Sequence, residues 1–342
     1  MFYGVRMVHL GATPSIDVYV THIGVISRSR RALAVTYPVR MVARKVVFYR
    51  WMSTTGRAPF VPHESAKKVA DLIALDEYNA VLEGDDTTTA VEIVNVGSET
   101  TSSHFRVMAL RNPGNRPAQW ELGSGLSSLQ LLDDQYPADV TNVAIWSNGI
   151  AAQDLARDSP RLGRLSFFLR HRVAGSVSFE PLFRPDMYER MTRMRGQLRS
   201  VHLAMTKPEY LDKDRGVFGT LVPAIWGPKA PSINIQLSVG KYGPKDRYLD
   251  EETEETVFRI AEHASDYVDR LIVRGRDTQT NKIERISLLN ERLQKEVDIP
   301  EDPKAAELPA ADEAFKEIEK AFREFEVQGS FTSAIQAQMM HG

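Results

Sequence analysis

The chain has 342 residues, of which 42% are hydrophobic and 26% charged, a composition typical of a globular protein with one large domain or two of ordinary size. It contains no cysteine, which excludes disulfides, iron–sulfur clusters and thiolate zinc sites and favours a reducing compartment such as the cytoplasm. The formal net charge of −2 argues against a uniformly basic nucleic-acid-binding protein. No stretch approaches the roughly 18 uninterrupted apolar residues of a spanning helix, so we expect no membrane crossing.

The first 150 residues predict an N-terminal extension followed by a sheet-and-helix domain. Residues 1–40 contain few acidic side chains and a group of arginines at 28–31, so we expect an extension or flexible arm, with Met41 as a candidate natural start. A domain over 41–155 follows. Its predicted elements are a strand at 42–51, a helix at 64–79, strands at 89–96 and 104–111, and a hairpin over 140–154 centred on Asn148-Gly149.

A second α+β domain is predicted over 156–298. Ser159-Pro160 supplies a helix start, and Leu162, Leu165, Phe168 and Leu169 recur at helical spacing after it. The predicted elements are helices at 161–172, 186–196 and 252–268, strands at 176–183, 198–205 and 232–239, and a hairpin formed by 270–276 and 283–288.

The C-terminal part combines a proline-rich segment with an amphipathic helix. Pro300, Pro303 and Pro309 predict a linker over 299–311, and residues 312–342 predict a helix over about 312–326 with a disordered tail after Gly329. The helix carries an apolar stripe that either docks within the chain or pairs two subunits: Phe315, Ile318, Phe322 and Phe325. The whole pattern predicts an α+β fold with mixed or antiparallel sheets and packed helices.

No residue pattern predicts a catalytic, cofactor or metal site. Glycine-rich nucleotide-binding motifs, His-Glu-x-x-His and Gly-x-Ser-x-Gly are all missing from the sequence, and no two of the eight histidines have metal-ligand spacing on a helix. One enzyme pattern stays open, because Arg164 and His171 match the Arg-x(4–6)-His spacing of a family of RNA-cleaving nucleases. Arg195 and His202 repeat that spacing across a predicted helix-to-strand junction, which shows how readily an arginine-rich region produces it.

Residues 151–200 are strongly basic, with ten arginines, five carboxylates and no lysine. Guanidinium groups bind phosphate oxygens bidentately and stay charged at every working pH, so this local excess predicts phosphate binding. The alternative is that the arginines pair with the acidic region 250–326. The candidate DNA contacts are Arg161, Arg164, Arg170, Arg172, Arg184, Arg193, Arg195 and Arg199.

Three segments resemble the RexA-like phage-exclusion (abortive infection) family. They are the hairpin and arginine helix at 140–172, the string Val177-Ser-Phe-Glu-Pro-Leu-Phe-Arg184, and Leu271-Ile-Val-Arg-Gly-Arg-Asp277 after a helix. A closing amphipathic helix matches in position. The resemblance implies a prophage-encoded antiviral defence protein that binds DNA with little sequence preference, forms homodimers, and works with a membrane-protein partner that performs the lethal step.

The sequence therefore predicts non-specific double-stranded DNA binding in phage exclusion, by a cytoplasmic sensor that signals to a partner and needs no cofactor. Two alternatives remain. One is an RNA-cleaving defence effector that uses Arg164 and His171. The other is a protein-interaction subunit whose arginines pair with acidic surfaces and which binds no nucleic acid.

Overall fold

The computed structural model describes residues 40–53, 59–83, 88–110, 118–121, 125–128, 137–156, 159–173, 176–206, 232–240, 247–263, 268–302 and 305–341. Residues Val39–Gly342 form one compact unit. Apart from Arg40, the predicted extension at 1–40 lies outside the described residues. The predicted domains at 41–155 and 156–298 both contribute strands to the same large sheet within this unit.

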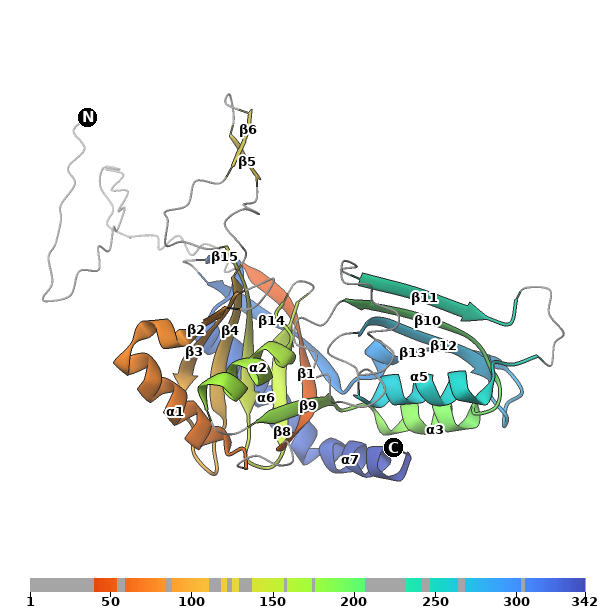
Figure 1. Cartoon of the computed structure of the whole chain (residues 1–342). Coiled ribbons are helices and arrows are strands. Elements are labelled where there is room, and N and C mark those ends of the chain that lie inside the picture. The colour runs from red at the N-terminus through yellow and green to blue at the C-terminus, as the bar shows by residue number, and fades with distance from the viewer. Residues whose placement is uncertain are drawn as a thin grey trace, which may run out of the picture. The chain divides into compact units, whose positions relative to one another are not determined.

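A nine-stranded antiparallel sheet forms the larger part of the unit (Figure 1). Its order is β15-β14-β1-β8-β7-β4-β3-β2, with β9 paired to β1. The 13-residue strand β1 holds it together, because its first half pairs with β14, its middle with β8 and its last five residues with β9. The strands are β1 (Met41–Ser53), β2 (Val81–Glu83), β3 (Thr88–Asn95), β4 (Ser103–Leu110), β7 (Ala138–Ile145), β8 (Ile150–Leu155), β9 (Val177–Pro181), β14 (Gln294–Asp302) and β15 (Ala305–Pro309).

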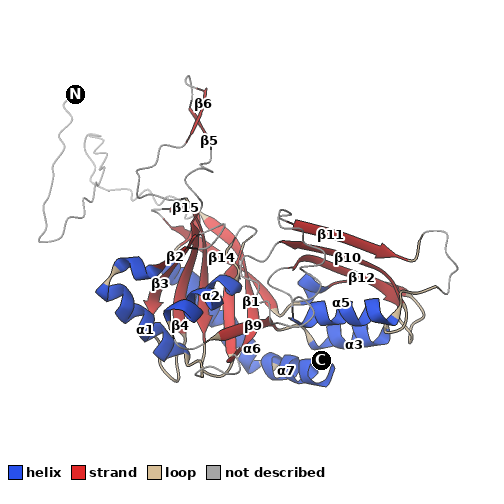
Figure 2. Ribbon diagram, in the orientation of Figure 1, coloured by secondary structure: helices blue, strands red, loops and turns tan. Residues whose placement is uncertain are grey.

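Helices cover both faces of the large sheet, as Figure 2 shows by colour. Helices α1 (Pro62–Leu75) and α2 (Leu162–Arg172) pack on the face that carries Val47 and Tyr49 of β1. Helices α6 (Ala311–Val327) and α7 (Ser330–His341) pack on the opposite face, against Val46 and Phe48. Because both faces are buried, β1 is apolar at consecutive positions from Val46 to Tyr49 instead of alternating.

A separate four-stranded antiparallel sheet, called here the small sheet, has the order β11-β10-β12-β13. Its strands are β10 (Leu198–Thr206), β11 (Ser232–Ser238), β12 (Val268–Arg276) and β13 (Ile283–Ser287). Helices α3 (Pro185–Arg193) and α5 (Glu251–His263) pack on one face through Met187, Met191, Val257 and Ile260. Two short 3-10 helices, η1 (Glu77–Ala80) and η3 (Leu288–Glu291), and a hairpin of β5 (Ala118–Glu121) and β6 (Gly125–Ser128) complete the described elements.

The α+β prediction is confirmed, and so is the Asn148-Gly149 hairpin. Strands β7 and β8 pair on either side of it, Gly149 takes the positive φ of 93°, and the Trp146 N–H donates to the Ile150 carbonyl over 2.9 Å. Positive φ is the conformation that such a tight turn requires and that glycine adopts without strain.

Three predictions about the C-terminal half are wrong. The helix expected at 252–268 ends by His263, because Val268 is the first residue of β12. The linker expected at 299–311 is mostly strand: β14 and β15 occupy its described ends, and Pro309 is tolerated because β15 is the edge strand of the sheet. The tail expected to be disordered after Gly329 forms α7.

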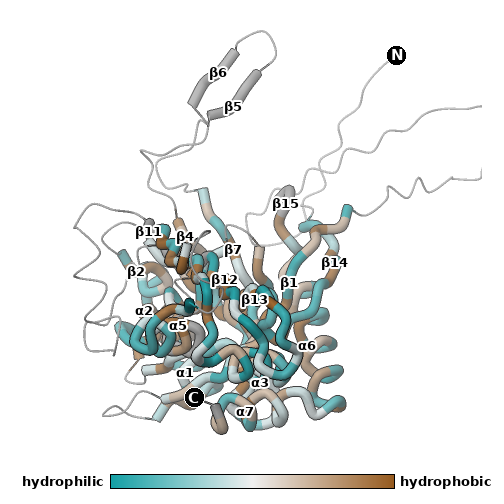
Figure 3. Tube along the Cα trace, turned by 90° about the vertical axis from the view of Figure 1, so that its right-hand side faces the viewer, coloured by the Kyte–Doolittle hydropathy of each residue, from teal (hydrophilic) through white to brown (hydrophobic). Residues whose placement is uncertain are grey.

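The apolar stripe of α6 is used within the chain. Phe315, Ile318 and Phe322 are buried against the large sheet, and Phe322 stacks on Trp146 with ring centroids 4.0 Å apart. Figure 3 colours the tube of α6 partly brown and partly teal, as expected for an amphipathic helix. Within the described residues, no helix combines the length and hydrophobicity needed to cross a membrane.

Candidate nucleic-acid interface

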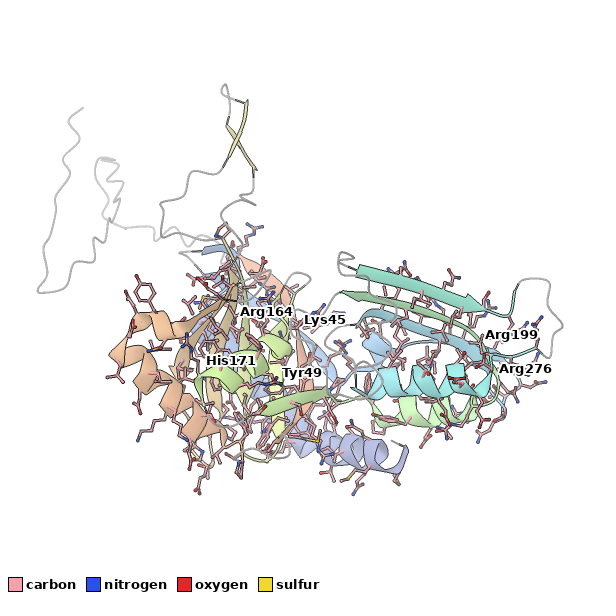
Figure 4. The ribbon with its side chains drawn as sticks, viewed as in Figure 1. Lys45, Tyr49, Arg164, His171, Arg199 and Arg276 are labelled. Atoms are coloured by element: carbon pink, nitrogen blue, oxygen red, sulfur yellow. The ribbon has the colours of Figure 1, made fainter. Side chains whose placement is uncertain are left out.

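The eight arginines singled out from the sequence lie in two places. Four lie in α2 or directly before it on the large sheet, and the other four lie between the residue before α3 and the second residue of β10 at the small sheet (Figure 4 labels one of each, Arg164 and Arg199). The α2 group is Arg161, Arg164, Arg170 and Arg172, and the second group is Arg184, Arg193, Arg195 and Arg199. The 151–200 segment therefore does not fold into a single basic surface.

The α2 arginines attach their helix to neighbouring elements. Arg164 Nη1 donates to Thr89 Oγ1 on β3 over 3.3 Å, and Arg172 Nη2 donates to the Val81 carbonyl over 2.5 Å. Arg161 and Arg170 are half-buried. Hydrogen bonds to charged groups typically contribute ~1.5–3 kcal/mol each, so these contacts give the α2 arginines a role in packing as well as charge.

The arginines around α3 are mostly neutralised by carboxylates of the same chain. Arg184 pairs with Glu291, and Arg190 bridges Glu291 and Glu284 over 3.1 and 3.4 Å. Burial would lower the pKa of Arg190, but the attraction and hydrogen bonds of these two carboxylates raise it overall. Glu284 and Glu291 lie within the acidic region 250–326. Pairing with this region was the alternative to phosphate binding for the arginines.

Arg193 forms a similar contact with the turn between β12 and β13. Its Nε donates to Asp277 Oδ2 over 2.8 Å, while the Thr280 and Gln279 N–H groups donate to Asp277 Oδ1. The hydrogen bond from the Thr280 N–H is the main reason that the pKa of Asp277 lies below its usual value, with Arg193 adding to the effect. Arg193 therefore anchors the turn to α3.

Arg195 and Arg199 are the two members of the second group without such a carboxylate partner among the described residues. The Arg195 guanidinium lies 5.0 Å from the centre of the Phe258 ring on α5, a cation–π distance. Arg199 falls at the irregularity in β10 between Leu198 and Ser200, at the end of the small sheet where Figure 4 also places Arg276.

The small sheet carries a second set of arginines on the face opposite its helices. Val201, Leu203, Leu271, Val273 and Ile286 face α3 and α5 in the buried core. Alternation then places the intervening side chains on the outer face. Register assigns to that face Ser200, His202 and Ala204 of β10, Asn234, Gln236 and Ser238 of β11, Arg270, Ile272, Arg274 and Arg276 of β12, and Ile283, Arg285 and Ser287 of β13.

The outer face of the small sheet, defined by these residues, is basic. Arg274 and Arg285 are directly opposite each other on β12 and β13, so two guanidinium groups stand on neighbouring strands. Like charges in this arrangement repel and destabilise the pair in the absence of a counter-ion. At the thirteen positions named above, the face carries four arginines and no carboxylate.

The arginines of this face are accessible. Arg270, Arg274 and Arg285 are exposed, and within the described residues their side chains make no ion pair or hydrogen bond. Arg276 is half-buried and donates to Asn281 Oδ1 over 2.8 Å. Residues two apart on one face of a strand are about 6.6 Å apart, so Arg270, Arg274 and Arg276 extend over about 20 Å.

Sequence reasoning missed this set, although the signal was present. The segment 270–276 was correctly predicted as a strand of a hairpin, and its arginines at 270, 274 and 276 have the even spacing that puts them on one face. What the sequence lacked was the pairing with β13 that adds Arg285, and the identity of the face that the helices cover.

Arg164 and His171, the pair considered for RNA cleavage, form hydrogen bonds with different groups. Arg164 binds Thr89, whereas His171 Nδ1 lies 2.9 Å from the Phe167 carbonyl of its own helix and its ring lies against Phe167. The two groups are seven residues apart on α2, or about 10 Å along its axis. The geometry brings neither group to a common reacting atom.

Ser102, His104 and Glu319 meet between β4 and α6 but do not have the geometry of a catalytic triad. Ser102 Oγ lies 2.8 Å and Glu319 Oε1 3.3 Å from the same imidazole atom, His104 Nε2. A triad needs the carboxylate on the other ring nitrogen, where it orients the base. Burial alone would raise the pKa of Glu319, but hydrogen bonds with His104 and Ser102 lower it overall.

Comparison with known proteins finds no matching family model and no matching curated protein. The described residues also contain no group of three histidines, aspartates or glutamates suited to a metal ion. The candidate interface is therefore defined by the arginines of the small sheet described above.

Proposed function

We propose that the protein binds double-stranded DNA without sequence preference, through the outer face of the small sheet. The observation that carries this proposal is the set of four arginines on that face with no carboxylate among its described positions. Such a surface is stabilised by a polyanion, since phosphates relieve the repulsion between Arg274 and Arg285 and form charge-assisted hydrogen bonds.

The composition of the face supports contact with the phosphate backbone. Ser200, Asn234, Gln236 and Ser238 add hydroxyl and amide groups around the arginines, and the His202 Nε2 lies 2.9 Å from Asn234 Oδ1. These residue types contact phosphates and sugars in protein–DNA complexes and position the protein without reading bases. Arg199, predicted from the sequence as a contact, lies at the end of the same sheet and extends this surface in the proposal. Arg195, also predicted as a contact, lies against Phe258 of α5 on the helix-covered side and is not part of this surface.

The wider role follows the RexA-like resemblance. In the proposal the protein acts in phage exclusion as a cytoplasmic sensor of DNA, forms homodimers, and signals to a membrane-protein partner. Ion pairing of Arg184, Arg190 and Arg193 within the chain assigns these residues to the scaffold beneath the surface, with the outer face as the contact.

Fluorescence anisotropy with a random-sequence duplex of about 25 base pairs tests the proposal. The variant Arg270→Gln/Arg274→Gln/Arg285→Gln removes the three exposed arginines, and we expect at least a tenfold weaker affinity at low salt. The control Lys67→Gln/Lys68→Gln/Lys316→Gln removes the same charge from exposed positions on α1 and α6 and should bind as the wild type does. Equal affinity of all three proteins, or no binding by the wild type, would overturn the proposal.

A matched single strand of the same length separates duplex binding from general polyanion binding. The proposal expects the duplex to bind more tightly at equal phosphate concentration, because its charge density is about twice as high. Stronger binding to the single strand would move the assignment to a single-stranded nucleic acid.

A further inference from the structure

A second basic feature adjoins the outer face of the small sheet and shares Arg270 with it. A cleft of about 930 Å³ is lined by parts of β1, β8, β12, β14 and η3 and by the residue that precedes α2. Pockets for small molecules are commonly 300–1,000 Å³, so this cleft has room for a nucleotide-sized ligand.

Cationic residues predominate in the cleft lining. Lys45, Arg161 and Arg270 line it from three different elements, and the buried Arg292 also contributes. The acidic members are Glu296 and Asp298, and Glu296 Oε1 lies 3.4 Å from Lys45 Nζ. The side chain of Arg44, by alternation, belongs to the opposite face of β1, beside Asp154. Four cationic residues against two carboxylates give the cleft an excess of positive charge, which favours an anion.

The strand register shows how these groups are arranged. Lys45 is opposite Leu155 on one side and Glu296 on the other, so the three side chains form a row across β8, β1 and β14. Asp298 is two residues beyond Glu296 on the same face, about 6.6 Å along the strand. Arg161 approaches this same face, because the preceding Pro160 carbonyl accepts a hydrogen bond from Gln153 of β8 over 2.5 Å.

The uncharged lining completes the chemistry. Leu155, Val268 and Leu289 provide apolar surface, and Asn290 and Gln294 provide amides. The cleft therefore offers cations for a phosphate, carboxylates that accept from hydroxyl or amino groups, and apolar contact for a ring. A phosphorylated nucleoside has these three parts, and an acidic side chain is a common partner of ribose hydroxyls.

We propose that this cleft binds a phosphorylated nucleoside. Lys45, Arg161 and Arg270 hold the phosphate, and Glu296 and Asp298 accept hydrogen bonds from the ribose or the base. Two sources carry this chemistry, a free nucleotide and the 5′-phosphorylated end of a strand. The site goes beyond duplex binding, because Lys45 and Arg161 lie outside the outer face of the small sheet.

Isothermal titration calorimetry of the full chain with AMP, adenosine and inorganic phosphate tests the proposal. We expect saturable AMP binding, weaker binding of adenosine, and at least a tenfold loss of AMP affinity in both Arg161→Gln and Lys45→Gln. The matched control is Arg285→Gln, which lies on the sheet face outside the cleft and should bind AMP as the wild type does. Two cleft variants keep the test decisive if one of them fails to fold.

A 12-nucleotide strand with a 5′-phosphate or a 5′-hydroxyl separates the two sources. A preference of the wild type for the phosphorylated strand that is lost in Arg161→Gln assigns the site to strand ends, and AMP binding without that preference assigns it to free nucleotides. The proposal would be overturned if the wild type showed neither AMP binding nor a preference for the 5′-phosphorylated strand. It would also be overturned if the wild type and both cleft variants bound AMP equally well. Arg285→Gln should weaken duplex binding alone, so failure of duplex binding is measured separately.

Discussion

Replacing Asp154 by asparagine should remove a pH-dependent loss of stability. Asp154 is fully buried in β8, where its carboxylate accepts hydrogen bonds from the Asn142 side chain over 2.8 Å and the Thr141 hydroxyl over 3.0 Å. Burial raises its pKa from 3.8 to about 6, while the hydrogen bonds of Asn142, the charge of Arg44 and the Thr141 hydroxyl oppose the rise. The folded state therefore binds this proton more tightly than the unfolded state does.

The sign and size of the effect follow from that difference. The favourable contribution is fully present below the unfolded pKa of 3.8, decreases between about pH 4 and 6, and is lost above the folded pKa. The two pKa values correspond to about 3 kcal/mol in total. Asparagine does not titrate, so the variant loses this pH dependence. The Oδ1 of Asn142 has no hydrogen-bond partner among the described residues. Rotation of the Asn142 side chain would let this Oδ1 accept a hydrogen bond from the side-chain amide introduced at position 154.

Urea unfolding of wild type and Asp154→Asn at several pH values between about 4 and 7.5 measures this effect. The stability of the wild type relative to the variant should fall by about 2–3 kcal/mol as the pH rises across that range. A difference that stays constant with pH would refute the assignment of the raised pKa to Asp154. The comparison removes the titration of all other groups, which the two proteins share.

Three further predictions concern packing and the roles of single residues. Gly275→Ala should lower the free energy of unfolding by about 1–3 kcal/mol in urea titrations, because a Cβ there would lie 3.0 Å from the Gln197 carbonyl oxygen; unchanged stability would contradict this. Ile318→Ala should cost about 2–5 kcal/mol, since Ile318 is fully buried between α6 and the large sheet, and a cost below 1 kcal/mol would show that α6 is not packed there. His171→Ala should leave duplex affinity unchanged within twofold in anisotropy titrations, because His171 lies on α2; loss of a ribonuclease activity in this variant would instead favour the RNA-cleaving alternative.

Much of the fold could be predicted because its signals are local. The alternation in β3 and β4, the Asn148-Gly149 turn and the helical spacing in α2 each depend on residues within about fifteen positions, and all three appear in the structure close to their predicted bounds. The errors occurred where long-range pairing decides the outcome. Residues 294–302 become strand because β1 pairs with them across more than 240 positions, which overrides the effect of Pro300.

The candidate site was harder to predict for the same reason. The density of arginines at 151–200 is visible in the sequence, but the partners that neutralise Arg184, Arg190 and Arg193 are Glu284, Glu291 and Asp277, about a hundred residues away. Charge density along the chain does not reveal which charges are paired in space. The face formed by β12 and β13 carries only four arginines, yet three of its four guanidinium groups make no ion pair or hydrogen bond in the described structure.

The salt dependence of duplex binding tests the central claim most directly. Log affinity should fall linearly with log salt concentration, and each arginine that contacts a phosphate contributes about 0.9 to the slope. We expect Arg270→Gln/Arg274→Gln/Arg285→Gln to flatten the slope by about 2–3, whereas the lysine control at 67, 68 and 316 should keep the wild-type value. Identical slopes for the wild type and the arginine variant would contradict the assignment of the outer face of the small sheet as the DNA-binding surface.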